Sequence, residues 1–218
     1  MKKQQQSVTA ALVVAHPDDE TLWAGGTVLM HPDWQWTVAS LCRLSDADRR
    51  TRFQQATQEL GAVGVMGDLD DGPEQMPLPQ NEVQQTLCSL LPAKHFDLIL
   101  THSPYGEYTR HRRHEETSQA VIALWERGLI RTSEVWLFAY ADSGQGGKDD
   151  PPRVIKTAHR LIPLPEEVWQ RKYRIISDIY GFAPETYESS IVSREEAFWC
   201  FRYPSQFRKW REAGRMVV

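Results

Sequence analysis

Five short apolar stretches recur along the first 140 residues, and a more polar segment with helical spacing follows each of the first four. The stretches are rich in aliphatic residues and show little alternation, which is typical of strands covered on both faces. The repeated order of strand and helix predicts an α/β fold, a Rossmann-like three-layer sandwich around a mostly parallel sheet. The predicted strands lie at 9–15, 36–41, 62–66, 96–100 and 135–139.

The segments between these strands carry helix start and stop signals. Asp18 or Asp19 can cap a helix that runs to Leu29. Gly61 and Gly128 stand just after two further helical patterns, where a left-handed residue commonly ends a helix. The later helices are predicted over 49–60, 82–91 and 113–128.

The pattern changes after residue 140. Glycine, aspartate, lysine and proline dominate 142–152, which is typical of a loop. Beyond this loop, helices are predicted over 165–180 and 194–201. We therefore expect one domain over 1–218, in which 142–218 forms a C-terminal lid or packing extension.

Composition narrows the class of protein. A formal net charge of -4 gives no reason to expect nucleic acid as a partner. The three cysteines are far apart and form no CxxC pair, which argues against a disulfide framework and against a thiolate zinc site. The apolar run near the N-terminus is too short to insert stably in a membrane, so a cytoplasmic protein is expected. The pattern carries no signal for the oligomeric state.

Side chains that can bind metals follow two of the predicted strands. Ligands in open α/β sheets bind outside the carboxyl ends of the strands, so the two groups meet if the first and fourth strands are neighbours. Two imidazoles and one carboxylate are a donor set that catalytic zinc takes, with a position left for water. The groups are His16, Asp18, Asp19 and Glu20 after the first strand, and His102, Glu107, His111, His114 and Glu115 after the fourth.

Within these groups, neighbouring residues suit different tasks. Of the pair Asp18 and Asp19, one carboxylate can bind metal while the other accepts a proton from the attacking water. His111 and His114, three residues apart, can share a helix face, one binding metal and the other stabilising an oxyanion or protonating the leaving amine. His102 and Glu107 fit a turn histidine and a surface glutamate at least as well as ligands.

Other interpretations compete with this one. An Asp-Asp-Glu run is commonly a helix cap, and the acidic turn 68–71 favours a solvated loop, with Asp70 or Asp71 as candidates for contact with sugar hydroxyls. A nucleotide-binding module on the same sheet is disfavoured because no G-x-G-x-x-G follows the first strand. A phosphodiesterase with two Mg²⁺ ions is disfavoured because the histidines favour zinc.

Two sequence blocks also resemble a known family. Residues 15–20, Ala-His-Pro-Asp-Asp-Glu, followed by Gly-Gly-Thr at 25–27, are similar to the signature of the LmbE-like, or PIG-L, zinc-dependent de-N-acetylases. Residues 101–108, which lead to His-Arg-Arg-His at 111–114, are similar to that family's H-x-x-H block. The resemblance implies the LmbE-like fold and a metal-dependent amidohydrolase that releases acetate from N-acetylated amino sugars or glycoconjugates.

The resemblance also implies roles for individual residues. One Zn²⁺ per chain would be held by His16, Asp19 and His114, with Asp18 as general base and His111 as oxyanion stabiliser or acid. Arg49 matches a position where relatives often place an arginine that contacts substrate. Arg113 departs from the pattern, because many relatives have an aspartate there that orients the other imidazole. Without that partner, His111 needs another orienting group, and a role as an acid is less well supported than a role as a neutral donor.

Overall fold

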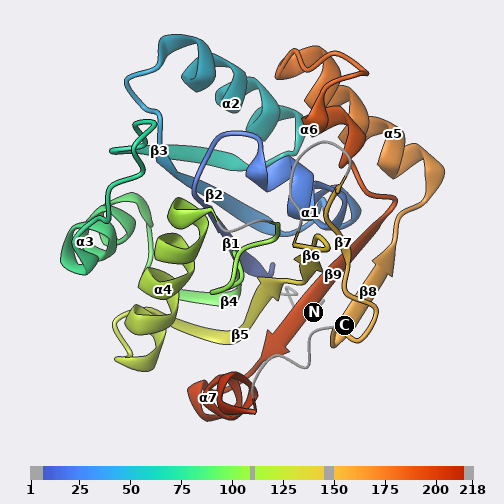
Figure 1. Ribbon diagram of the computed structural model, residues 1–218. Coiled ribbons are helices and arrows are strands. Elements are labelled where there is room, and N and C mark those ends of the chain that lie inside the picture. Colours follow the sequence, from blue (N-terminus) through green and yellow to red (C-terminus); the bar gives the residue numbers. More distant parts are fainter. Residues whose placement is uncertain (1–6, 109–110, 145–149, 214–218) are drawn as a thin grey trace, which may run out of the picture.

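Every apolar stretch of the first 140 residues forms a strand in the computed structural model, which describes residues 7–108, 111–144 and 150–213. The central sheet has seven strands in the order β3-β2-β1-β4-β5-β9-β8 (Figure 1), of which the first five are mutually parallel. The predicted α/β class is therefore confirmed. The strands are β1 Thr9–Val14, β2 Gln35–Cys42, β3 Val63–Leu69, β4 His95–Thr101, β5 Arg131–Phe138, β8 Arg160–Pro163 and β9 Glu195–Phe201, and a small second sheet pairs β6 Tyr140–Ala141 with β7 Arg153–Val154.

Helices follow the first four strands as the spacing predicts. Gly61 and Gly128 have φ angles of 72° and 67°, so both occupy the left-handed position that ends the preceding helix. The helices of this half are α1 Asp19–Met30, α2 Ala47–Glu59, α3 Gln80–Leu90 and α4 Arg112–Glu126. Those of the C-terminal part are α5 Glu166–Arg174, a π-helical turn Ile175–Ile179, α6 Tyr187–Ser190 and α7 Pro204–Glu212.

Strand β1 shows why the apolar run is continuous. Leu12 faces a core that it shares with α1, α2 and the π-helical turn, whereas Val13 faces a second core with α3, α4 and α7. Both side chains are completely buried. Helices therefore cover the two faces of the sheet in three layers (Figure 1), which accounts for the unbroken apolar run 10–14 in the central strand.

The order of the strands creates the site. The chain leaves β1 toward β2 on one side, while β4 pairs with β1 on the other, with Ala10 opposite Leu98 and Val13 opposite Thr101. The expectation that the first and fourth strands are neighbours is confirmed. Their carboxyl ends form the point at which connections diverge, which is where ligands bind in such sheets.

The C-terminal part contains one error of prediction. Residues 194–201 were expected to be helical, but Glu195–Phe201 is strand β9, antiparallel to β5. Phe198 and Phe201 suggest a helical period by their spacing, yet they enter the two opposite cores, as residues an odd number of positions apart in a strand do. The aromatic content of this segment suits a strand that is covered on both faces.

A buried ion pair fastens this C-terminal strand to α1. The Glu196 carboxylate, fully buried on β9, accepts hydrogen bonds from the backbone N–H groups of Gly26 and Thr27 at 2.8 and 2.7 Å and from Lys172 Nζ at 2.7 Å. A Cβ atom at Gly26 would stand 2.5 Å from Leu164. This close approach explains a glycine inside the helix that carries the acidic residues. Within the described residues, no helix has both the length and the apolar character needed to cross a bilayer.

Candidate active site

The turn after β1 places adjacent acidic residues in different environments. Asp18 adopts φ 104°, a conformation rare for a residue with a side chain, and its backbone N–H donates to Glu20 Oε2 at 3.0 Å. The hydroxyl of Tyr180, which follows the π-helical turn, donates to the other oxygen of Glu20 at 2.8 Å. Burial raises the pKa of Glu20 to about 7. Glu20 therefore stabilises the turn through the backbone of Asp18, and it does not line the cavity described below.

Three donor atoms, from the turn after β1, from α1 and from α4, lie close together. His16 Nδ1 lies 3.2 Å from Asp19 Oδ2, and His114 Nε2 lies 3.3 Å from each of these two atoms. In a tetrahedral zinc site with bonds of about 2.0–2.1 Å, ligand atoms are about 3.3–3.4 Å apart. The triangle thus has the dimensions of three corners of such a tetrahedron, and its donor set of two imidazoles and one carboxylate fits zinc.

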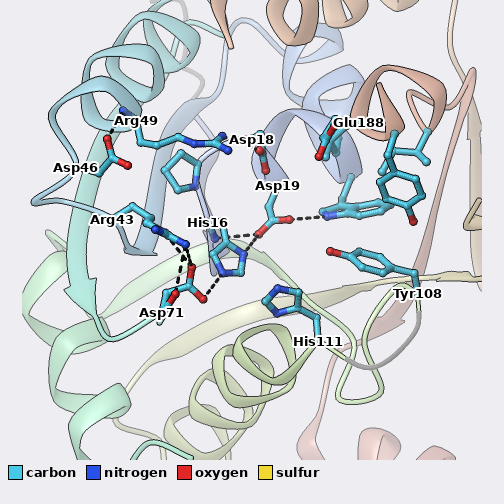
Figure 2. A pocket seen from close by; sticks show the side chains of 15 residues that line it. His16, Asp18, Asp19, Arg43, Asp46, Arg49, Asp71, Tyr108, His111 and Glu188 are labelled. Atoms are coloured by element: carbon cyan, nitrogen blue, oxygen red, sulfur yellow. Dashed lines mark hydrogen bonds and ion pairs between the residues drawn. The ribbon is translucent and has the colours of Figure 1, made fainter. Parts of the chain in front are cut away.

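Each of the two imidazoles is oriented by a carboxylate on its far side. His114 Nδ1 lies 2.7 Å from Glu107 Oε2, and His16 Nε2 lies 3.2 Å from Asp71 Oδ1. A carboxylate in this position takes the N–H of the ring, so the lone pair of the other nitrogen is directed at the triangle. Figure 2 shows Asp71 held between His16 and Arg43.

Glu107 and His102 correct the sequence interpretation. Glu107 is completely buried rather than at the surface, and its Oε2 also contacts His102 Nδ1 at 3.0 Å. The backbone N–H of Ala15 donates to His102 Nε2 at 3.0 Å, so both nitrogens of that ring are already engaged. Burial raises the pKa of Glu107, but His102 and His114 lower it to about 2. His102 therefore supports Glu107 and the end of β1.

Asp18 and His111 flank the triangle. Burial and the neighbouring Asp19 raise the pKa of Asp18 to about 8, although Arg49, whose Nη1 lies 3.1 Å from the Asp18 carboxylate, opposes the shift. Burial, together with His114 and His16, lowers the pKa of His111 to about 3. His111 is thus a neutral imidazole near pH 7. Its Nδ1 is buried and has no hydrogen-bond partner among the described residues.

A cavity of about 450 Å³ opens over these groups. Figure 2 shows a polar side, with Arg43, Asp46 and Arg49, facing an aromatic side that includes Tyr108. The aromatic side is completed by residues of α1 and α6. The full lining comprises His16, Pro17, Asp18, Asp19, Leu22, Trp23, Arg43, Asp46, Arg49, Asp71, Tyr108, His111, Tyr187, Glu188 and Ile191.

The sequence located most of this site and missed part of it. Arg49 lines the cavity as expected, whereas His114 lies just behind it with 1% of its surface exposed. The acidic turn is not uniformly solvated, because the Asp71 side chain is only 7% exposed while that of Asp70 is 63% exposed. Proximity to the sheet edge was the one available signal for Asp71. Of the Gly-rich loop considered above, residues 145–149 lie outside the described part of the chain.

This chain is similar to a known protein family and to several solved structures. The family model described as PIG-L, GlcNAc-PI de-N-acetylase, matches residues 11–125. No curated protein matches the chain. Among solved structures, the N,N'-diacetylchitobiose deacetylase of Pyrococcus horikoshii is similar with a TM-score of 0.66 and 16% identity, over 90% of this chain and 85% of that one.

Two further solved structures share the fold. The A40926 pseudoaglycone deacetylase Dbv21 has a TM-score of 0.57 and 17% identity, over 91% of this chain and 98% of that one. The 4-carboxy-2-hydroxymuconate hydratase GalB of Pseudomonas putida KT2440 has a TM-score of 0.57 and 16% identity, over 97% and 91%. Because deacetylases and a hydratase share this fold, the reaction must be argued from the site itself.

Proposed function

The chain belongs to the PIG-L family of GlcNAc-PI de-N-acetylases, and on that premise we propose that it is a zinc-dependent hydrolase of N-acyl groups. The favoured acyl group is acetyl, and the favoured substrate is an amino sugar or a glycoconjugate that contains one. The observation that carries the proposal is the triangle of His16 Nδ1, Asp19 Oδ2 and His114 Nε2. One zinc ion per chain is proposed, because the two potential donor groups of the described residues share His114 and cannot form independent sites.

The roles of the remaining residues follow from their positions. The chemistry expected of zinc here is Lewis acidity, which polarises an amide carbonyl and lowers the pKa of water. Asp18 is the general base, because its carboxylate lines the cavity beside the triangle and is not one of the three corners. Neutral His111 donates a hydrogen bond to the carbonyl oxygen as negative charge develops there.

Binding of the substrate is assigned to the two sides of the cavity. The Arg49 guanidinium lies over the ring of Phe182, but it keeps N–H donors with no hydrogen-bond acceptor among the described residues, so they can bind polar groups of a ligand. Tyr108 and Tyr187 offer apolar ring surface to the face of a sugar. Tyr187 comes from α6, so residues 142–218 act in this proposal as an extension that completes the cavity wall rather than as a separate domain.

The competing functions fit the site less well. A phosphodiesterase with two Mg²⁺ ions needs a bridged set of oxygen ligands, whereas imidazoles supply two corners of the triangle. A nucleotide-binding module needs a glycine-rich turn after β1 that lets backbone amides approach phosphates. Here the turn carries the side chains of Asp18 and a buried Glu20 instead of such glycines.

The experiment combines metal analysis with a substrate panel. Purified protein is expected to bind about one zinc per chain and to release free amine from at least one N-acetylated sugar or glycoconjugate. Asp18→Asn should retain zinc and lose at least about 100-fold in kcat, because the base is gone while the shape is kept. Asp33→Asn, an exposed change at the opposite end of the sheet, is the matched control. Full activity of Asp18→Asn would contradict the proposal.

A further inference from the structure

Arg113 occupies the position at which the sequence departs from the family pattern, and its contacts with the loop between β3 and α3 indicate a structural role. We propose that Arg113 is a positioning residue that holds the loop between β3 and α3, so that Asp71 in this loop orients His16 in the metal site. The inference rests on the proposed zinc site. It adds the loop between β3 and α3 to the segments of the chain that support this site. Arg113 itself lies on α4, one residue before His114.

The side chain of Arg113 is 1% exposed and makes contacts in three directions. Its Nη1 lies 2.6 Å from the Glu116 carboxylate one turn further along α4. Its Nε donates to the backbone carbonyl of Asp70, and its Nη2 donates to that of Met76 at 2.9 Å. One guanidinium therefore binds both ends of the segment 70–76 to α4.

Glu116 makes a second connection between the same two elements. Its Oε1 accepts a hydrogen bond from the backbone N–H of Leu78 at 3.0 Å, while its Oε2 is paired with Arg113. The two side chains thus form a buried clamp, which we define as Arg113 and Glu116. Each charge of the clamp is paired, and its remaining contacts are hydrogen bonds to backbone and a contact of Arg113 Nη2 with the Asp70 carboxylate at 3.4 Å, so its burial is electrostatically compensated.

The clamped segment presents Asp71 to the metal site. Asp71 directly follows the residue whose carbonyl Arg113 holds, and its Oδ1 lies 3.2 Å from His16 Nε2. Gln75 donates to the same oxygen at 2.7 Å, and Arg43 binds the other oxygen of Asp71, Oδ2, at 2.6 Å. Arg43 is 46% exposed and sits at the rim of the cavity, so the buried clamp is the more rigid of the two anchors.

A planar guanidinium suits this task because its five N–H donors point in fixed directions. It can serve Glu116, Asp70 and Met76 at once, which a single ammonium group cannot do with the same geometry. An aspartate at position 113 could not donate to these carbonyls. In this chain, then, the residue next to the proposed ligand His114 supports His16 through a loop instead of supporting His111 directly.

The test measures zinc affinity of the full chain by competition with a chelator, which needs no substrate. Asp71→Asn is expected to weaken binding about 10- to 100-fold, as loss of such a carboxylate support typically does. Arg113→Lys, which keeps the positive charge beside Glu116, should weaken zinc binding by at least about threefold. The effect is smaller than that of Asp71→Asn because Arg113 acts on His16 only through the loop that carries Asp71. Arg112→Lys, the exposed neighbour on α4, is the matched control and should leave affinity unchanged.

The double variant separates positioning from general destabilisation. Because Arg113 acts through Asp71, adding Arg113→Lys to Asp71→Asn should change zinc affinity by less than about twofold. Should Arg113→Lys fail to fold, Glu116→Gln replaces it and should weaken affinity in the same direction. Equal affinities for Arg113→Lys and Arg112→Lys, or single effects that multiply in the double variant, would overturn the inference. Zinc binding without amide hydrolysis by the wild type would overturn the proposed function alone.

Discussion

The two imidazoles of the proposed metal site are supported in contrasting ways. Glu107, which orients His114, lies in the connection between β4 and α4, only seven residues before His114, and is fully buried. Asp71, which orients His16, comes from a loop 55 residues away and is held partly by the exposed Arg43. One side of the site is thus built locally and sealed, while the other is assembled from distant segments at the cavity rim.

This difference indicates how the site should respond to change. Glu107 accepts hydrogen bonds from His102, His114 and the backbone of Ser103, so its loss would leave several buried donors unpaired. The Asp71 carboxylate is instead paired with Arg43, whose side chain is 46% exposed to solvent. We therefore expect loss of Glu107 to act mainly on the stability of the protein and loss of Asp71 to act mainly on its metal affinity.

Metal removal is expected to have the largest effect. At free zinc about a thousandfold above its Kd, stripping the ion with a chelator should lower the free energy of unfolding by about 4 kcal/mol. Hydrogen exchange should increase more in residues 70–76 than in 102–108, because the distant support loses its anchor first. Chemical denaturation and exchange with mass analysis measure both. Equal exchange in the two segments would remove the contrast between the supports.

Glu107→Ala comes next. Two buried imidazole N–H groups would lose their acceptor, and unfolding should become easier by about 3 kcal/mol, measured by denaturant titration. Glu82→Ala, an exposed change on α3, is the control and should stay within about 0.5 kcal/mol of wild type. A loss for Glu107→Ala no larger than that of the control would mean that the buried side is not the stabilising one.

His102→Phe tests whether this ring is a support or a ligand. It would leave the N–H of Ala15 unpaired and would remove one of the two imidazole hydrogen bonds to Glu107 Oε2, at a cost of about 2 kcal/mol in unfolding free energy. Zinc affinity should fall by less than about tenfold, because the triangle is intact. Abolished zinc binding in a folded variant would instead make His102 a ligand, in the set that it forms with Asp19 and His114.

Arg43→Met should have the smallest effect. Arg43 is half exposed, so loss of its ion pair with Asp71 is worth at most about 1 kcal/mol in stability. Zinc affinity is expected to change by about twofold at most, because the clamp of Arg113 and Glu116 still holds the loop. Isothermal titration with zinc would measure this change. A loss as large as that of Asp71→Asn would make Arg43, rather than the clamp, the principal anchor.

How far the sequence determined these results depends on the range of the contacts. The strand β1 and its neighbour β4 follow from local apolar patterns and the rules of parallel sheets, and with them the meeting of His16 and His114. The supports were not predictable in the same way. Asp71 reads as part of a solvated acidic turn until the loop folds back over the sheet edge and is bound by Arg113.

The C-terminal part shows the same limit. Residues 195–201 offer aromatic side chains whose spacing suits either element, and pairing with β5 decides for the strand. Glu196 on this strand is fully buried because Lys172 and the amides of α1 surround it, contacts that span 24 and about 170 residues of sequence. No local pattern encodes such a partner.

The backbone of Asp18 has a consequence for how this protein could change under selection. A residue with a side chain at φ 104° carries conformational strain of about 1–3 kcal/mol, which glycine would not bear. Asp18→Gly should therefore be tolerated or even more resistant to heat, while lacking the proposed base. In a library sorted for thermal stability alone, glycine is expected to accumulate at position 18, and a sort that also demands turnover should restore aspartate.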